Sequence, residues 1–286
     1  MTTVDQFESV FRSASKDIYR RHDIPLRDAM VVTDLPREEA EQFAKRLTQY
    51  LEATHEDVRL MVLAGDDYRG TGELLERVEN AGPSLVCAYR NLHSADFDRP
   101  YSLGEHLDVL TQVASAPVLV VPNPRLTGDA NKRWQNAGTG RVMVVTDHLA
   151  GDNRLIDWAV LFCADKGRLL LTHVEDDATY KRYINAIGKI PAIDTDEAER
   201  LIKAQLLKEP ADYIASIHSA LEAEELPISI EADVTMGHRL ADYERLVREH
   251  NASLLVLNTR DEDQAAMHGL AYPLAVEMRD VPMLML

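Results

Sequence analysis

Nine short apolar runs constrain the fold of this chain more than any other feature. They are rich in Val, Leu and Met, and they are apolar at successive positions instead of alternate ones. Strands of this kind suit a parallel sheet covered by helices, because both faces of each strand are then buried. We expect strands at Ala29–Thr33, Val58–Ala64, Ser84–Tyr89, Val118–Pro122, Val142–Thr146, Arg168–Val174, Ile228–Val234, Ser253–Leu257 and Pro282–Leu286.

Segments with a helical period separate these runs. Apolar residues recur at spacings of three and four from Ile156 to Cys163, and Gly167 is the predicted end of that helix. A second such segment, from Leu240 to Val247, precedes the run at Ser253. Strands that alternate with helices predict an α/β fold.

An internal repeat divides the chain into two halves. The segment Ala29–Asp34, AMVVTD, returns as VMVVTD at Val142–Asp147, 113 residues later. At the other end, Gly104 precedes Pro117 by 13 residues, just as Gly269 precedes Pro282, at an offset of 165. The second half is therefore 52 residues longer in its middle, and we expect the first half to lack one strand–helix unit, with its second strand absent.

The repeat predicts the domain boundaries. We expect a shortened domain at 27–122, a linker rich in turn-forming residues at 123–140, and a complete domain at 141–286. Residues 1–26 stand outside the repeat and predict an amphipathic helix. It would cover the short first domain or form a dimer or partner contact, and its apolar positions are Val4, Phe7, Phe11, Ala14 and Ile18.

The ordered set of strands, helices and glycines resembles the universal stress protein domain, and it does so twice. The second half matches best, with LLLTHV ending at Val174, a third strand ending at Gly237, and the closing VPMLML. The resemblance implies two doubly wound parallel sheets, similar to the adenine nucleotide alpha hydrolase-like plan, plus the N-terminal helix. It also implies that the two domains pair within the chain through their last strands.

The resemblance further implies an adenine-nucleotide site in the second half. Members of this family that bind ATP hold the base near an Asp after the first strand and at the backbone of a Val that closes the second. Their phosphates lie in a glycine-rich loop, where backbone N–H groups and a helix N-terminus face the anion. The matching positions are Asp147, Val174, Gly237, Asn258 and Gly269.

Both phosphate loops depart from the family pattern. Asn258 and Asp261 stand where the first two glycines belong, Leu270 replaces the hydroxyl residue, and Asp261–Asp263 places three carboxylates where a triphosphate would lie. Each carboxylate–phosphate contact would cost about 3–4 kcal/mol before salt screening. The first half keeps Asp34 but has Glu105 in place of the hydroxyl residue. We therefore expect no ATP binding of the family kind, although a nucleoside or another small polar ligand in the second half stays open.

Composition narrows the function further. With 48 acidic and 31 basic residues the net charge is −17, and neither half is basic, which argues against nucleic acid as a partner. We expect no membrane insertion, because no apolar run approaches the ~18 residues that span a bilayer. Two cysteines in apolar runs predict buried, reduced thiols, and the N-terminus lacks the pattern of a signal peptide, so we expect a cytoplasmic protein.

Other groups offer weaker signals. No metal-ligand spacing is present, and we expect no metal site, although His93, Asp96 and Asp98 form a polar cluster that could hold a divalent cation. Asp194 predicts the start of a long helix. The apolar segment Ala178–Ile193 would cover the first half's missing unit or its own sheet, or it would form a lid or partner surface.

The sequence thus predicts a non-catalytic, regulatory stress-response module with no required cofactor. The alternative is a sensor of AMP, ADP, ATP or another small ligand that uses the second half. A homodimer and an unidentified protein partner both stay open as further assemblies.

Overall fold

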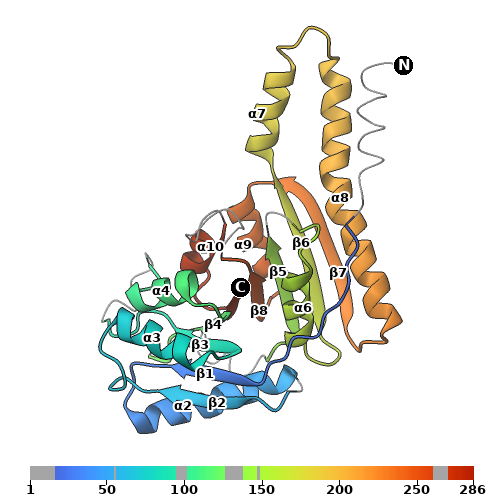
Figure 1. The fold of residues 1–286 in the computed structure, drawn as a ribbon. Coiled ribbons are helices and arrows are strands. Elements are labelled where there is room, and N and C mark those ends of the chain that lie inside the picture. Colours follow the sequence, from blue (N-terminus) through green and yellow to red (C-terminus); the bar gives the residue numbers. More distant parts are fainter. Residues whose placement is uncertain (1–16, 55, 95–101, 126–137, 147–148, 260–269) are drawn as a thin grey trace.

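The computed structural model describes residues 17–54, 56–94, 102–125, 138–146, 149–259 and 270–286. Within these residues nine strands form one sheet in the order β2-β1-β3-β4-β9-β8-β5-β6-β7 (Figure 1). Each of the nine predicted runs contains a strand, so this expectation is confirmed. The strands are β1 (Asp28–Val32), β2 (Arg59–Leu63), β3 (Leu85–Tyr89), β4 (Val118–Val121), β5 (Arg141–Thr146), β6 (Arg168–Asp176), β7 (Ser229–Gly237), β8 (Leu254–Leu257) and β9 (Met283–Met285).

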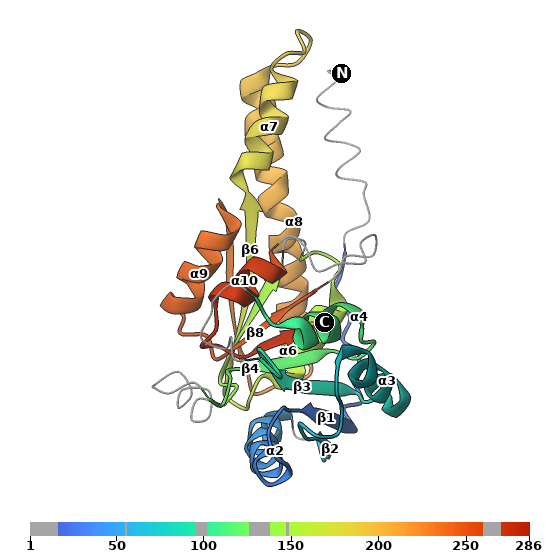
Figure 2. The same cartoon turned by 90° about the vertical axis from the view of Figure 1, so that its left-hand side faces the viewer.

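Helices connect the strands and cover both faces of the sheet. Helices α9 and α8 lie on opposite faces of the sheet at β6 (Figure 2). Right-handed crossovers place helices on opposite faces when the chain adds strands first toward one edge of the sheet and then toward the other. The described helices are α2 (Arg37–Leu51), the short 3₁₀ helix η1 (Glu52–Thr54), α3 (Thr71–Ala81), α4 (Glu105–Val113), α6 (Asn153–Phe162), α7 (Asp177–Ile187), α8 (Thr195–Ala223), α9 (Arg239–Glu249) and α10 (Ala271–Glu277).

Aspartate caps begin three of the helices in the second half. Asp152, Asp176 and Asp194 each accept a hydrogen bond from a backbone N–H in the first turn of α6, α7 and α8. The predicted start of the long helix at Asp194 is therefore confirmed. The predicted end at Gly167 is wrong, because α6 stops at Phe162, and Gly167 instead approaches the carbonyl of Ala164 closely.

One antiparallel ladder joins the two halves. β4 and β9 pair with Val118 opposite Met285 and Val120 opposite Met283, whereas the other strand pairs are parallel. The two sheets that the resemblance implies therefore join through their last strands into one continuous sheet of the described chain. Each half would otherwise expose the unpaired backbone groups of an apolar edge strand, and the ladder satisfies both edges at once.

The two halves share a strand order. This order shows that the second strand of the first half, which we expected to be absent, is present. The order β2-β1-β3-β4 repeats as β6-β5-β8-β9, with β7 added at the outer edge of the second half. The second strand of the first half is therefore present as β2, which pairs in parallel with β1. The unit without a counterpart in the described first half is the edge strand β7 together with α7 and α8.

The start of the described chain lies against α8. Residues 17–27 are not helical, so the predicted helix does not extend over them, and residues 1–16 lie outside the described part. Tyr19 donates its backbone N–H to the Ser216 hydroxyl at 2.9 Å, and its own hydroxyl donates to Asp157 at 2.7 Å. Its ring packs edge-on against Tyr213. Ile18, beside it, is 63% exposed.

A buried arginine links the two halves beside the β4–β9 ladder. Arg90 follows β3 in the first half, and its guanidinium donates to the carbonyls of Val276 and Met278 at the C-terminal end of α10. These carbonyls carry the negative end of the helix dipole, which favours a cation there. Burial, with a smaller contribution from Arg279, lowers the pKa of Arg90 to about 9.

We predict that Arg90→Ala lowers the free energy of unfolding by about 2–4 kcal/mol, because it removes two charged hydrogen bonds and leaves a void. Chemical denaturation followed by circular dichroism measures the change. Arg77→Ala is the control, since Arg77 is a surface residue that pairs with Glu73 on α3 and such pairs contribute little. Equal loss in both variants would contradict the role given to Arg90.

Candidate functional site

The two carboxyl edges of the sheet are where this fold places its ligands. In doubly wound sheets a crevice opens where neighbouring strands lead to opposite faces. In the second half this point lies between β5 and β8, and in the first half it lies between β1 and β3.

In the second half, the backbone of Val174 is bonded within the protein. Val174 is fully buried near the end of β6. Its N–H donates to the Tyr243 hydroxyl at 3.2 Å, and its carbonyl accepts from Nε of Arg239 at 3.2 Å. The Tyr243 hydroxyl in turn donates to the carbonyl of Thr146 at 2.6 Å. Two side chains of α9 thus occupy the backbone groups that an adenine base would need.

The other predicted site residues are partly placed. A Cβ on Gly237 would lie 2.2 Å from Oδ2 of Asp242 and 3.5 Å from a methyl of Val174, so the structure brings Gly237 beside Val174, and a larger residue at 237 would have to displace the Asp242 carboxylate. The Asn258 amide donates to the Asp152 carboxylate, which ties the end of β8 to the start of α6. Asp147 and Gly269 lie outside the described residues, as do Asp261–Asp263.

In the first half, Asp34 is the centre of a buried polar cluster. Its carboxylate accepts hydrogen bonds from the Tyr89 hydroxyl, from the Arg125 guanidinium at 2.6 Å and from the His93 amide at 2.9 Å. Burial alone would raise the pKa of Asp34, but these three hydrogen bonds hold it below its usual value. The sequence left Asp34 without a pocket, whereas the structure surrounds it with the chain's own donors.

Backbone geometry holds this cluster in place. The Asn123 amide donates to the carbonyl of Arg90, and its oxygen accepts from the N–H of Arg125, which positions that guanidinium for Asp34. Gly104 adopts φ +90°, and a Cβ there would lie 2.8 Å from Cα of Asn91. Only glycine allows this approach without strain. The loop after β3 is therefore fixed against the start of α4.

Two imidazoles complete the cluster. The rings of His93 and His106 lie 5.2 Å apart, and Tyr68 meets both edge-on, at 4.9 Å and 5.8 Å. Nε2 of His106 is buried without a hydrogen-bond partner among the described atoms. Burial lowers the pKa of His106 and the neighbouring His93 lowers it further, although Glu105 and Asp34 act in the opposite direction. His106 is therefore held neutral.

A tyrosine hydroxyl closes the first strand of each half. The Tyr68 hydroxyl donates to the carbonyl of Thr33 at 3.0 Å, and the Tyr243 hydroxyl donates to the carbonyl of Thr146. Thr33 and Thr146 are equivalent positions of the repeat. We call Tyr68 and Tyr243 the strand-end tyrosines. Both are buried, and both come from the segment before the equivalent strands β3 and β8, so the ends of the two first strands are bonded in the same way.

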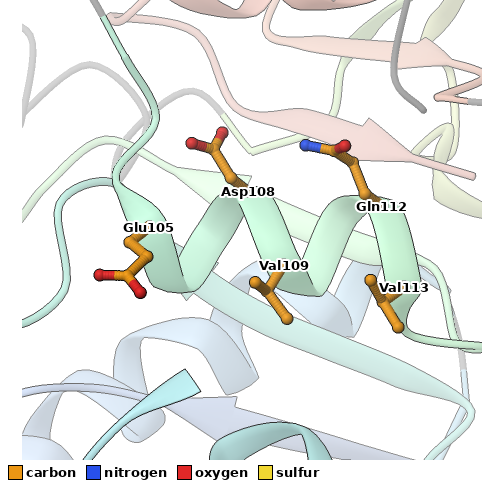
Figure 3. Close-up of a pocket in the computed structure, with 5 residues that line it drawn as sticks. All are labelled: Glu105, Asp108, Val109, Gln112 and Val113. Atoms are coloured by element: carbon orange, nitrogen blue, oxygen red, sulfur yellow. The ribbon is translucent and has the colours of Figure 1, made fainter. Parts of the chain in front are cut away.

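A separate hollow of about 340 Å³ lies on α4 (Figure 3). Asp108 and Gln112 point to one side of the helix, whereas Val109 and Val113 point to the other. Burial raises the pKa of Asp108. All five lining residues, Glu105 included, come from this one helix, so no other element of the described chain encloses the hollow.

Two further acidic side chains near the carboxyl ends of the strands have structural roles. Asp67 accepts from Arg37 and from the Ala64 N–H, and Asp176 caps α7. Of the predicted His93 cluster, Asp96 and Asp98 lie outside the described residues, and no metal-binding group of three His, Cys, Asp or Glu residues occurs among those described. Cys87 and Cys163 are free and buried, as expected, and burial raises the pKa of each thiol to about 12.

Sequence reasoning missed the strand-end tyrosines, Arg239, Tyr89 and Arg125. Tyr68 lies 17 residues before Leu85, whereas Tyr243 lies 11 residues before Leu254, so no shared spacing reveals their equivalent roles. Arg125 lies 91 residues from Asp34 and follows the last strand of its half. Only the topology of the sheet brings these groups together.

We predict that Tyr243→Phe lowers the free energy of unfolding by about 1–3 kcal/mol, because the N–H of Val174 and the carbonyl of Thr146 lose a buried partner. Denaturant titration measures the change. Tyr183→Phe is the matched control, since Tyr183 is 54% exposed. If Tyr243→Phe unfolds like the control, the hydroxyl does not hold the strand ends.

We also predict a pH dependence from His106. The unfolded chain takes up this proton near pH 6.5, whereas the folded state resists it, so His106 costs stability as the pH falls below about 6.5. His106→Gln should reduce the loss of melting temperature between pH 7.5 and pH 5.5 in a thermal unfolding series. His218→Gln, which changes a half-exposed histidine of α8, should retain the wild-type loss. Identical pH profiles for wild type and His106→Gln would refute a neutral, buried His106.

The match to a known protein family covers most of the second half of the chain. No curated protein matches the chain. Solved structures that align with it include a functionally unknown protein, PA1789, from Pseudomonas aeruginosa PAO1 (13% identity, TM-score 0.49, 92% of each chain). A universal stress protein from Archaeoglobus fulgidus DSM 4304 also aligns (14% identity, TM-score 0.49, 91% of this chain and 98% of that one). Residues 138–269 match the universal stress protein family.

Proposed function

We propose that this chain is a tandem universal stress protein that acts as a non-catalytic regulatory module of a stress response. The repeated strand order and the match at 138–269 support two related domains in the chain. The paired last strands β4 and β9 support their assembly within one molecule. The module would act through its surfaces and not through a bound nucleotide.

The backbone of Val174 is the observation that carries this proposal. Its N–H and its carbonyl are the groups that would pair with an adenine base, and both are bonded to side chains of α9, Tyr243 and Arg239. A base could enter only by displacing two buried hydrogen bonds and the rigid ring that makes one of them. Each displaced hydrogen bond would leave a buried polar group without a partner, which costs about 1–3 kcal/mol.

The neighbouring groups disfavour a triphosphate as well. The Asn258 amide is turned toward Asp152, so it is engaged within the protein where the family has a glycine. The sequence Asp261–Asp263 adds three negative charges in the segment that would face phosphate. Repulsion of this kind exceeds the ~1 kcal/mol that a helix N-terminus offers an anion.

The first half offers a base no better site. Asp34, which stands at the position of the base-side carboxylate, already forms an ion pair with Arg125. Removing one partner of such a pair would leave a buried, uncompensated charge. The Asp34 cluster therefore supports a structural role for the first half.

A cytoplasmic location completes the proposal. Two free, buried thiols suit a reducing compartment. None of the described helices combines the length and the apolar character needed to cross a membrane.

Calorimetric and thermal-shift titrations with ATP, ADP, AMP and adenosine, each with Mg²⁺, test the proposal. We predict no saturable heat and no rise in melting temperature up to millimolar ligand. A ligand present at 100 times its Kd would add about 2.7 kcal/mol to the stability, so binding would be readily detected.

Two variants sharpen this titration. Tyr243→Phe frees the N–H of Val174, and Asp147→Ala removes the base-side carboxylate at the matching position of the repeat. Saturable binding of ATP or AMP to the wild type that Asp147→Ala abolishes would overturn the proposal in favour of a nucleotide sensor. Weak binding that appears only in Tyr243→Phe would support the closing role of the hydroxyl.

A further inference from the structure

Two histidines of the first half meet between the end of β3 and the start of α4. His93 lies in the turn after β3, and His106 lies in the first turn of α4. Their ring centres are 5.2 Å apart, and the ring planes are tilted by 44°. Neither imidazole has a role in the function proposed above.

The surroundings of His106 fix which of its ring nitrogens carries the proton. The imidazole forms a hydrogen bond with the carbonyl of Leu92, whereas Nε2 is buried and has no hydrogen-bond partner among the described residues. The bond to Leu92 therefore comes from Nδ1. Since a carbonyl can only accept, the proton of the neutral ring lies on Nδ1, and Nε2 keeps a free lone pair. Histidines that bind metal ions have this arrangement, with one N–H held by a carbonyl or carboxylate and the other nitrogen bare.

The separation of the two rings suits one shared metal ion. Two imidazoles that bind the same tetrahedral zinc ion, at Zn–N distances of about 2.0–2.1 Å, hold their ring centres about 5 Å apart. The observed separation of 5.2 Å agrees with this value. Burial and the neighbouring His93 lower the pKa of His106. Its Nε2 therefore needs to lose no proton before it binds a metal at neutral pH.

The backbone holds His93 firmly in this position. Asn91 and His93 adopt φ angles of +59° and +56°, in the left-handed region that residues other than glycine adopt rarely. The Asn91 N–H donates to the carbonyl of Leu103 at 2.8 Å. The His93 N–H donates to the Asp34 carboxylate at 2.9 Å, and Leu92 between them is buried. The turn thus fixes the base of a side chain that is itself exposed.

The electrostatic surroundings favour a cation between the rings. The carboxylates of Asp34 and Glu105 both act on His106 in the direction that stabilises positive charge. Asp34 is already paired with Arg125, so it contributes its field and not a ligand atom. Because His93 is exposed, a turn of its ring gives an ion from solvent access to Nε2 of His106.

We propose that His93 and His106 form a binding site for a divalent transition-metal ion such as Zn²⁺, with Nε2 of His106 as the buried ligand. Neutral imidazole suits zinc, copper and nickel ions. The described residues supply no group of three metal-binding side chains, so water fills the remaining positions of the ion. The ion ties the turn after β3 to the start of α4, and its binding therefore stabilises the first half. This site stands whether or not the second half binds a nucleotide.

Calorimetric titration of the full chain with ZnCl₂, after a chelator has removed bound metal, tests the site. We predict that one Zn²⁺ binds per chain and raises the melting temperature. His93→Gln and His106→Gln should each raise the Kd for Zn²⁺ at least tenfold. Since His93 is exposed, its variant keeps the test decisive even if His106→Gln is poorly folded.

Two controls accompany this titration. His218→Gln should leave the Kd for Zn²⁺ unchanged, since His218 is a half-exposed histidine of α8 that faces Glu222. MgCl₂ should produce no saturable heat, because Mg²⁺ prefers oxygen ligands.

The ring nitrogens of the histidines provide a second readout. Long-range ¹H–¹⁵N spectra distinguish a protonated ring nitrogen from a bare one. In the metal-free protein we predict a proton on Nδ1 of His106 and a bare Nε2. One equivalent of Zn²⁺ should shift the resonance of this Nε2 together with one ring nitrogen of His93, and His93→Gln should remove the shift.

Four results would overturn the proposal. The wild type could show no saturable binding of Zn²⁺, or it could bind Mg²⁺ as tightly as Zn²⁺. Both glutamine variants could retain the wild-type Kd, which would place the ion elsewhere. Finally, metal-free His106 could carry its proton on Nε2, which would leave no lone pair for a metal.

Discussion

The antiparallel ladder between β4 and β9 is the interaction on which the rest of the structure depends. Four of the nine strands lie on one side of it and five on the other, and each half alone would end in an apolar edge strand, such as Val118–Val121, with unpaired backbone groups. Pairing the two edges satisfies both and makes one sheet. Arg90 of the first half also links the two halves, because its guanidinium donates hydrogen bonds to carbonyls at the C-terminal end of α10. The halves are therefore fixed relative to each other, and each keeps its carboxyl edge free of the joint.

The protein's own side chains bond the strand ends at both of those carboxyl edges. In each half a strand-end tyrosine donates to the carbonyl of an equivalent threonine, Thr33 or Thr146. The surrounding partners differ: the first half binds its Asp34 carboxylate with Arg125 and Tyr89, whereas the second half binds the backbone of Val174 with Tyr243 and Arg239. The two halves thus bond the ends of their strands with different side chains. On the function proposed above, these bonds stand where a ligand would otherwise bind.

The sequence predicted the strands well because their signal is local. A run such as Val142–Val145 is apolar at every position, and burial on both faces requires that pattern wherever the strand lies. The Asp34 cluster could not be predicted, since its partners are 55 to 91 residues away and only the strand order brings them together. The same limit applies to Ala178–Ile193: its apolar residues argue against a solvated loop, but they do not say whether the segment covers the sheet or leaves it. Of the predicted site, Val174 and Gly237 do meet, and Asp147 and Gly269 lie outside the described residues.

The central claim is that the protein's own side chains occupy the groups an adenine base would need. The amide resonance of Val174 reports on this directly, because its N–H is one of those groups and is bonded to the Tyr243 hydroxyl. In ¹H–¹⁵N spectra of the full chain, the account predicts slow hydrogen exchange at Val174 and a chemical shift that millimolar ATP leaves unchanged. A saturable shift of the Val174 amide on addition of ATP, with faster exchange in the free protein, would contradict it.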